Sequence, residues 1–349
     1  MIHAPHPCYS RSDASKSLPL LRKPACHDAF FFDTELACWV ASTAELVGQI
    51  MQNPHCQVLA PASASRAAEL FSRLIRMNEG EAHAPLKRRL QQGLAELDLS
   101  ATHLLLLTQR WLKRLPEGPS LNTLCRHLPV LVLADALGFA PQLRLVEWIS
   151  QLVAYLSAFS SEAERLQASV AAEHLLAHFS GLRPEHCSLL LQEFNQQVVL
   201  ANLIGLLTQS YEATAGLLGN SLIALAQNPE VYQRILAGIE PISALVESVA
   251  VQDPSVQNTR RVVTQAIEIY GQQLAVGDTI LLLLASANHD ASSSEHFSFG
   301  YGRHACPGQA LATRLATVIL DAYLCGENRP LPVRWAYQAS ANARIPQFN

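Results

Sequence analysis

Apolar residues recur every three or four positions through much of the chain. Between about residues 64 and 229 the segments AAELFSRLIRM, APLKRRLQQGLAEL and HLPVLVLADALGF show this spacing, which is typical of amphipathic helices. A longer apolar run from Leu190 to Gln227 ends at Asn228-Pro229, a pair that stops helices. A helix that is apolar on every side has to lie inside the protein. We therefore expect a helical body crossed by one long buried helix.

Two stretches have a different pattern, typical of strands. The segment FFFDTELACWVAST (30–43) alternates around an acidic turn and predicts a small hairpin, after which AELVGQIMQN becomes helical. The segment RRVVTQAIEIYGQQLAVGDTILLLLASA is β-branched, with Gly271 and Gly277 at turns, and predicts two or three strands. The last helix is expected to run from Gln309 to about Cys325. The fold class is mainly α with a minor β portion.

Composition narrows the range of functions. The 349 residues are 49% hydrophobic and 15% charged, so a large apolar interior is available. The formal charge of -4 and the absence of a long basic run disfavour nucleic acid as a partner. The first 20 residues hold no apolar segment of signal-peptide length, and no run of 18 apolar residues occurs anywhere. We expect a cytoplasmic protein without a membrane anchor.

The segment HFSFGYGRHACPGQALA (296–312) surrounds one cysteine with turn formers and then helix formers. Its glycines let the backbone adopt positive φ angles and approach a flat group closely. Cys306 precedes a helix start, where the dipole favours an anion and lowers the pKa of a thiol. Such a cysteine is a nucleophile, a metal ligand or an inert buried residue, and the residue type alone does not decide among these.

The spacing F-G-x-G-x-H-x-C-x-G in this segment resembles the proximal haem-ligand signature of the bacterial, soluble members of the cytochrome P-450 superfamily. The resemblance implies the P-450 fold, in which haem b lies between a long distal helix and a proximal cysteine loop. It makes Cys306 the axial thiolate ligand of the iron. It also implies that His304 donates to a haem propionate, and that Phe299, Gly302 and Gly308 belong to the haem-binding loop.

Further expected haem contacts come from two more segments. MNEGEAHAPLKRRL (77–90) resembles the P-450 helix whose His-x-x-x-Arg pair reaches the propionates, and the pair here is His83 and Lys87. In VQNTRRVVTQAIEIYG, Arg261 aligns with an arginine that many bacterial members direct at a propionate. The alternative for Lys87 and Arg261 is a solvated basic residue on an amphipathic face.

The distal side of the expected haem site is assigned to LLTQSYEATAGLLGNSLIALAQNPE (206–230), which resembles the kinked distal helix of the superfamily. Glu212 supplies the expected acid. Ala213 stands where an alcohol normally follows the acid, and Thr214 is one place further on. Ser210 replaces a glycine that normally permits the helical bulge. The candidate catalytic positions are therefore Glu212, Ala213 and Thr214, with a proton relay that departs from the usual one.

The proximal side also departs from the pattern. Ser248 and Val251 stand where the superfamily has its Glu-x-x-Arg pair, and only Ala291–Glu295 remain of the irregular segment that normally pairs with it. Loss of both groups is more tolerable than loss of one, because a buried charge left alone is destabilising. The sequence does not show what then holds the ligand loop. Pro307 also cannot offer the N–H that usually follows the ligand, which favours a more strongly donating sulfur.

The resemblance implies one P-450-like domain over residues 1–349. Its expected parts are an irregular leader (1–20), a hairpin and helix (30–63), a helical part (64–240) with the distal helix at about 190–227, a β portion (255–290), and the ligand loop with the proximal helix (296–325).

The implied function is that of a haem-thiolate monooxygenase, which inserts one oxygen atom from O2 into a small or carrier-tethered apolar substrate, with a role in secondary metabolism. A ferredoxin or flavodoxin would supply electrons, for which Lys87–Arg89 and Arg303 offer a basic surface. Because of Ala213, peroxide-driven oxidation and redox-neutral dehydration or rearrangement stay open. A degenerate haem-binding module without catalysis is the third hypothesis.

Overall fold

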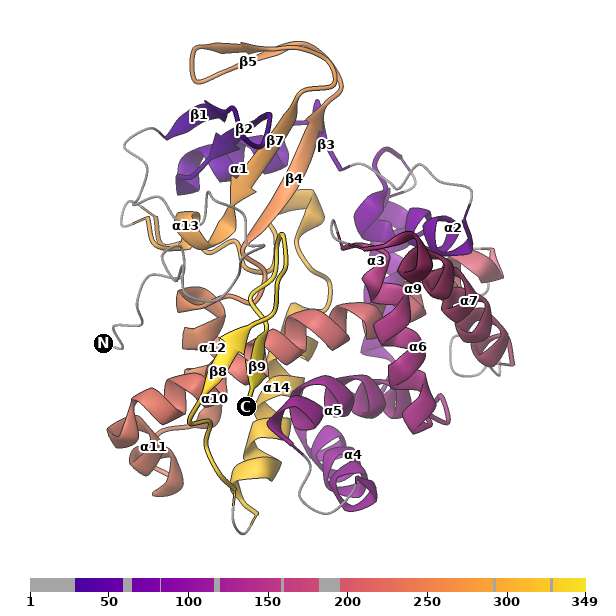
Figure 1. Ribbon diagram of the computed structural model, residues 1–349, viewed down its shortest axis with the longest axis vertical. Coiled ribbons are helices and arrows are strands. Elements are labelled where there is room, and N and C mark those ends of the chain that lie inside the picture. The colour runs from indigo at the N-terminus through magenta and orange to yellow at the C-terminus, as the bar shows by residue number, and fades with distance from the viewer. Residues whose placement is uncertain are drawn as a thin grey trace.

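The computed structural model describes residues 29–58, 65–81, 83–115, 120–157, 160–181, 195–290, 293–326 and 329–349. The expected leader (1–20) and the first residues of the expected distal helix (190–194) lie outside these ranges. Figure 1 shows a small sheet at one end of the molecule and helices through the rest. This arrangement confirms the mainly α fold class.

Helices follow the apolar periodicity, and several begin at Ser or Thr side chains that accept a first-turn N–H, as at Thr43 and Ser161. The helices before the long central one are α1 (Ala44–Gln52), α2 (Arg66–Ser72), the short 3₁₀ helix η3 (Ile75–Met77), α3 (His83–Ala95), α4 (Ala101–Arg114), α5 (Leu121–Ala136), α6 (Leu143–Ala154) and α7 (Glu162–Phe179). Those after it are α11 (Pro229–Leu236), α12 (Ile242–Gln252), α13 (Leu284–Asn288), the 3₁₀ helix η6 (Gly302–His304) and α14 (Gln309–Leu324).

The central helix is continuous but changes its winding. It consists of α9 (Gln196–Gln209), a π-helical turn η5 (Ser210–Thr214) and α10 (Ala215–Gln227). Helices α5, α6, α12 and α14 pack along it, and most of its side chains are buried. This is the apolar helix that the sequence predicts to cross the core.

The main sheet has the strand order β1-β2-β7-β4-β3. Strands β1 (Phe30–Asp33) and β2 (Cys38–Ala41) form the predicted antiparallel hairpin, with Phe30 opposite Ala41. Strand β7 (Thr279–Leu283) pairs with β2 in parallel and with β4 (Asn258–Val263) antiparallel, and β3 (Cys56–Gln57) closes the edge on β4.

The prediction of two or three strands in the later β segment was wrong. This segment forms four strands, because β5 (Ile267–Ile269) and β6 (Gln272–Leu274) make a separate hairpin between β4 and β7. Tyr270 and Gly271, with φ angles of 50° and 74°, make its tight turn. The end of the apolar run, which reads as strand in the sequence, becomes helix α13.

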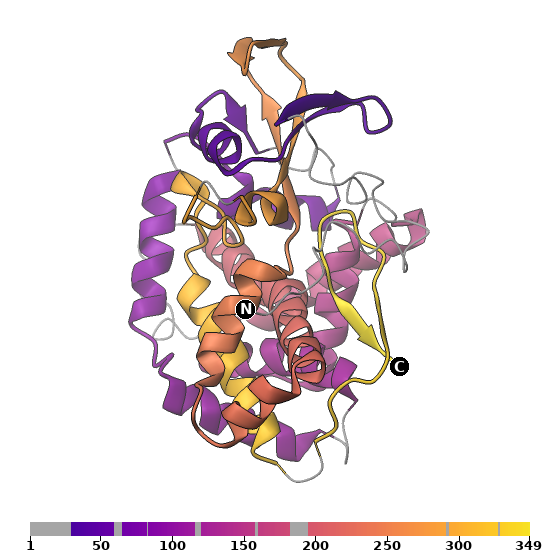
Figure 2. The ribbon, with the colours of Figure 1, turned by 90° about the vertical axis from the view of Figure 1, so that its left-hand side faces the viewer.

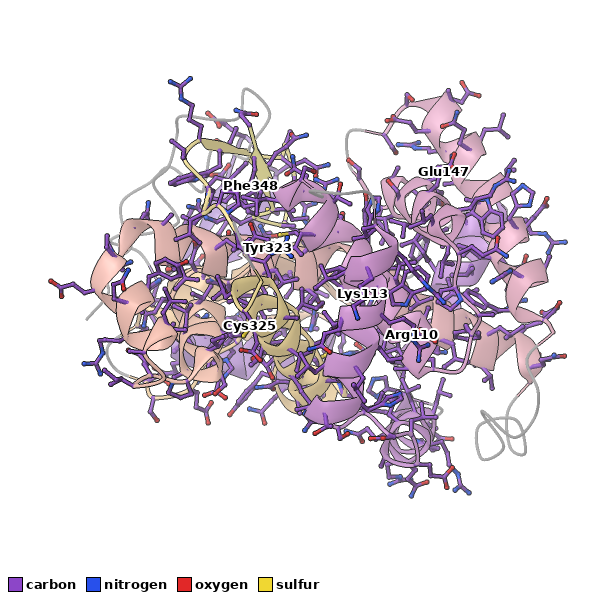
Figure 3. The ribbon with its side chains drawn as sticks, turned by 90° about the horizontal axis from the view of Figure 1, so that it is seen from below. Arg110, Lys113, Glu147, Tyr323, Cys325 and Phe348 are labelled. Atoms are coloured by element: carbon purple, nitrogen blue, oxygen red, sulfur yellow. The ribbon has the colours of Figure 1, made fainter. Side chains whose placement is uncertain are left out.

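A final strand pair, β8 (Trp335–Tyr337) and β9 (Pro346–Phe348), lies against the helices and has no sequence prediction. Asn122 of α5 anchors it, because its amide donates to the Phe348 carbonyl over 2.9 Å and its oxygen accepts the Phe348 N–H over 2.9 Å. Figure 3 labels Phe348 in its view from below. No helix in the described ranges is long and apolar enough to cross a membrane.

Two apolar cores meet at the segment that carries the cysteine motif. The larger core joins the helices, and a smaller one lies between the sheet and α1; Figure 2 shows these two parts from the side. Phe297 belongs to the smaller core, whereas Phe299 packs against the larger one. The ligand loop is thus fixed where the two parts of the protein join.

Candidate active site

The loop around Cys306 owes its shape to two glycines with positive φ. Gly300 has a φ of 72° and Gly302 a φ of 58°. A Cβ atom on Gly300 would lie 2.5 Å from the His304 carbonyl oxygen, so a side chain there has no room. The Cys306 N–H donates to the Phe299 carbonyl over 2.7 Å and closes the loop. This fold directs Cys306 into the interior.

The Cys306 thiol lines an internal cavity just before α14. Burial raises its pKa, while the Gly308 N–H bond to the sulfur and the nearby cations Lys87 and Arg76 lower it. The donor that Pro307 cannot provide is thus supplied one residue later, by Gly308. Because Gly308 replaces the missing donor, the sulfur is not expected to be richer in electrons than in other members of the superfamily.

The cavity has a volume of about 700 Å³, within the range of about 300–1,000 Å³ that is common for sites enclosing a small molecule. One wall is the ligand loop and the start of α14. The opposite wall is the central helix near its π turn. Residues on the two walls include Phe299, Gly300, Cys306, Gly308 and Leu311 on one side, and Leu206, Gln209, Ser210, Ala213, Thr214 and Leu217 on the other.

The π turn forms although Ser210 replaces the usual glycine, so the expected obstacle to the bulge is absent. Just before the turn, Thr208 Oγ1 and Gln209 Nε2 each donate to the Gly205 carbonyl over 2.9 Å. The turn presents Ala213 and Thr214 to the cavity.

Glu212 belongs to the same turn but is not among the residues that line the cavity. Burial raises the pKa of its carboxyl to about 7, although the cations Arg76 and Arg126 act to lower it. Of the three expected catalytic positions, the structure therefore places two on the cavity wall and the third behind it.

The expected propionate contacts fall into two groups. Arg261 and His304 line the cavity, as do Phe299 and Gly308 of the loop. His83 is buried with its ring 4.8 Å from the ring of His304, and Lys87 donates to the Arg303 carbonyl over 2.7 Å. His83 and Lys87 therefore support the loop from behind, and they are not among the residues on the cavity wall, nor is Gly302.

Glu79 is a central residue of this site that sequence reasoning missed. Its carboxylate accepts from the Val58 N–H over 3.0 Å, from Arg303 Nε over 3.1 Å and lies 2.9 Å from His304 Nε2. Burial alone raises the pKa of Glu79, but these hydrogen bonds and cations outweigh it and lower the pKa to about 2. The only sequence signal is an acid four residues before His83, and it does not reveal these partners.

Arg303 fastens the loop to the rest of the protein. Besides Glu79, it donates to the carbonyl oxygens of Gln52, Asn53 and Cys56 over 3.0 to 3.2 Å. An arginine whose side-chain nitrogens all donate to protein oxygens in this way has a structural role, because it holds separate segments together. Arg303 and Lys87 were expected to form part of a basic surface for an electron donor. Both side chains are instead bonded to other parts of the protein, so they do not contribute to such a surface.

The residues around the cavity fit haem. The wall holds a single cysteine sulfur, apolar side chains for a flat ring, and cations for acidic substituents. Arg261 is buried, and in the part of the chain that the structure describes its Nε has no hydrogen-bond acceptor; a carboxylate would supply one. Within the described ranges no three His, Cys, Asp or Glu side chains gather to bind a bare metal ion.

Comparisons with known proteins agree with this geometry, although no family model matches the chain. The chain is 27% identical over 225 residues to a biotin biosynthesis cytochrome P-450 of Bacillus subtilis, covering 56% of this chain and 57% of the relative. It is 33% identical over 143 residues to a 20-oxo-5-O-mycaminosyltylactone 23-monooxygenase of Streptomyces fradiae, covering 36% and 33%. The chain thus spans little more than half the length of the first of these relatives and a third of the second.

Solved structures show the same fold. P-450BioI in complex with an acyl carrier protein carrying hexadec-9Z-enoic acid superposes with a TM-score of 0.78 at 20% identity, covering 91% of this chain and 93% of that one. The haem domain of a Tepidiphilus thermophilus P-450 gives 0.71 at 21% identity, covering 91% and 89%. Together with the cysteine loop and the π turn, these likenesses show that the chain has the fold of the bacterial cytochromes P-450, whose cofactor is haem.

Proposed function

We propose that this protein is a haem-thiolate monooxygenase that inserts one oxygen atom from O2 into a small or carrier-tethered apolar substrate. The observation that carries the proposal is that Cys306 of the ligand loop and Thr214 of the central helix line the same cavity. A ligand sulfur on one side and an alcohol on the other is the arrangement that oxygen activation needs.

Cys306 would hold the iron through its sulfur. Bound haem supplies the iron that binds and activates O2, and a thiolate ligand donates electron density that favours O–O cleavage. The Gly308 N–H and the cations Lys87 and Arg76 favour the thiolate form at this sulfur. The hydrogen bond from Arg303 to Glu79 would help to hold the loop in place around the bound haem.

Thr214 is assigned to proton delivery, because it carries a hydroxyl on the distal wall and Ala213 does not. Its Oγ1 would hold a water and pass a proton into the cavity. Glu212 lies two residues before Thr214 in the same π turn, and its pKa is raised to about 7. Its carboxyl would return a proton to that water from behind the cavity wall.

The substrate is assigned from the lining. Apolar side chains dominate the cavity away from the loop, including Met51, Leu74, Leu133, Leu156, Leu206 and Leu217. An acyl chain suits this lining, and the similar P-450BioI was solved with an acyl carrier protein. A ferredoxin or flavodoxin would supply the electrons, docking near the exposed Arg88 of α3. We place this activity in the cytoplasm and in secondary metabolism.

The absorption spectrum of the purified protein, reduced under carbon monoxide, tests the proposal. A strongly red-shifted carbonyl Soret band that is lost in Cys306→Ala supports thiolate ligation by Cys306. NADH-dependent product formation with a surrogate ferredoxin and reductase then supports oxygen insertion. A carbonyl band typical of histidine, or a protein without haem, contradicts it and favours a degenerate module.

A second candidate function has its own observation. Ala213 occupies the usual alcohol position and Glu212 lies off the cavity wall, which favours chemistry that needs no proton relay to O2. Peroxide-driven oxidation or a redox-neutral rearrangement would then use the same Cys306 site. Turnover with hydrogen peroxide, or without any reductant, together with none under NADH and reductase, supports this second candidate.

A further inference from the structure

Arg76 is a cation in the cavity wall without a hydrogen-bond or ion-pair partner in the described part of the chain. It belongs to η3, and its side chain lines the same cavity as Cys306 and Thr214. Its Nε is buried and has no acceptor among the described residues, while the residue as a whole is partly exposed. Burial lowers the pKa of Arg76, and the charges of Glu212 and Cys306 act on it only at longer range.

The backbone around Arg76 is held firmly. Asn202 of α9 accepts the Ile75 N–H over 2.9 Å and donates to the Arg73 carbonyl over 3.0 Å, and it is itself buried. Asn78 donates to the Leu74 carbonyl over 2.6 Å on the other side. These bonds fix the short helix above the cavity, so the direction of Arg76 follows from the packing of neighbouring residues.

The other cations at this site are already used. Lys87 and Arg303 donate to protein carbonyls, and His304 is paired with Glu79. Arg261 donates from Nη1 to Thr259 Oγ1 and to the Arg260 carbonyl oxygen. Among these five, Arg76 alone donates no hydrogen bond to any residue that the structure describes.

A guanidinium remains charged at any physiological pH, so it cannot escape burial by losing its proton. An uncompensated buried charge is strongly unfavourable. The group that best compensates an arginine is a carboxylate, because two parallel N–H···O bonds match its fork. Glu212 has the right chemistry but forms no ion pair with Arg76 within the described residues.

We propose that Arg76 is a carboxylate-binding site in the wall of the cavity. Two sources can supply that group: a propionate of haem, or an acid group on the substrate. The assignment deepens the proposed function and rests on it for the identity of the cavity. It adds a basic group that can bind an acid to the mainly apolar part of the lining away from the ligand loop.

The test compares Arg76→Gln, which removes the charge but keeps a polar side chain, with Arg76→Lys. The matched control is Arg73→Gln, in the same segment, because Arg73 pairs with Glu69 and is not on the cavity wall. The first arm measures haem transfer from the full-length holoprotein to apomyoglobin. The second measures, by calorimetry, binding of dodecanoic acid and of its methyl ester.

If Arg76 binds a propionate, haem leaves R76Q at least tenfold faster than wild type, and R76K and R73Q stay close to wild type. If Arg76 binds a substrate acid, haem transfer is unchanged, and wild type prefers the acid to the ester by at least tenfold while R76Q has no preference. Either result supports the carboxylate site. It is overturned if R76Q matches R73Q in both arms.

Failure of the proposed function is distinguishable from failure of this site. A wild-type protein that purifies without haem contradicts the proposed function. The acid and ester titrations need neither iron nor the thiolate, so on the same preparation they still decide whether Arg76 selects a carboxylate. If the haem-free wild type prefers the acid to the ester and R76Q does not, the carboxylate site is supported. If the haem-free wild type shows no preference for the acid, the site is overturned.

Discussion

Asn288 donates its side-chain amide to the carbonyl oxygen of Val251 over 3.0 Å and so joins α13 to the end of α12. The same nitrogen donates to Ser298 Oγ over 2.7 Å, and Asn288 Oδ1 accepts the Phe297 N–H over 2.7 Å. Val251 is the position at which the superfamily pattern has an arginine. A neutral amide therefore connects this helix to the start of the ligand loop, with no buried charge to compensate.

Asn288→Ala removes these three bonds and leaves the Phe297 N–H and the Val251 carbonyl without their partner. At about 1 kcal/mol for each hydrogen bond, we expect a loss of about 2–3 kcal/mol in the free energy of unfolding, measured by urea titration. Because the loop loses its attachment to α12, we also expect a smaller share of the reduced carbonyl complex to show the red-shifted Soret band.

Asn122→Ala is the control for general destabilisation, since Asn122 of α5 makes two bonds to Phe348 of β9, outside the ligand loop. It should cost about 1–2 kcal/mol and leave the carbonyl band unchanged. Asn288→Asp keeps the acceptor for Phe297 and should fall between wild type and Asn288→Ala. An unchanged band in Asn288→Ala would show that the amide does not position the loop.

Gly300→Ala tests whether the loop needs glycine for space as well as for its φ angle. Gly80 is the matched control, because its φ of 81° is equally unfavourable for alanine but a Cβ there meets nothing within 4 Å. Gly80→Ala should cost about 1 kcal/mol from its φ angle alone. Gly300→Ala should cost clearly more and release haem faster to apomyoglobin, because its Cβ meets the His304 carbonyl. Equal effects of the two substitutions would exclude the steric explanation.

Much of the fold could be predicted because its signals are local. The helical period, the alternation in the first hairpin and the glycine spacing around Cys306 each lie within a few residues. The later β segment was harder to interpret, since an unbroken apolar run such as TILLLLASA fits a buried strand or a buried helix equally well. The structure uses it for both, as β7 and α13.

The site was predictable only as far as one segment defines it. Cys306 and Arg261 were assigned from motifs, but the partners of Glu79 come from residues more than 200 positions apart and from Val58. The role of Asn288 depends on where the end of α12 lies in space. Such contacts follow from packing and leave no pattern in a single sequence.

Glu79→Gln should change how stability depends on pH. The pKa of Glu79 is lowered from 4.5 to about 2 in the folded protein, so its contribution is complete above pH 4.5 and is lost as the pH falls toward 2. A shift of this size corresponds to about 3 kcal/mol. The difference in unfolding free energy between wild type and Glu79→Gln should be about that value at pH 6 and fall to about half by pH 3. A constant difference would show that the charge of Glu79 is not involved.

Thr214→Ala should uncouple oxygen reduction from product formation, because it removes the hydroxyl of a residue that lines the cavity and that we propose delivers a proton there. With NADH and a surrogate reductase, we expect several-fold more hydrogen peroxide released for each NADH consumed. Ala213→Thr is the complementary variant, since it restores an alcohol directly after Glu212, and should lower that ratio. If neither ratio changes, the relay does not pass through this turn, and the peroxide-driven or redox-neutral function gains support.

Glu212→Gln should stabilise the protein increasingly as the pH rises from about 4.5 to 7, and have little effect below pH 4.5. Burial raises the pKa of Glu212 from 4.5 to about 7 in the folded protein, so folding is favoured below pH 4.5 relative to higher pH, and this advantage is lost as the pH rises through 7. At pH 8 the buried carboxylate costs about 3 kcal/mol. Glutamine avoids this cost because it has no charge to desolvate.

Urea unfolding of wild type and Glu212→Gln at pH 4 and pH 8 measures this difference. We expect curves that nearly coincide at pH 4 and a variant that is more stable by about 3 kcal/mol at pH 8. Glu247→Gln controls for the loss of one negative charge elsewhere on the chain and should show no such pH dependence. A Glu212→Gln variant that is less stable at pH 8 would mean that the ionised carboxylate is paired, with Arg76 or Arg126, more strongly than its burial disfavours it.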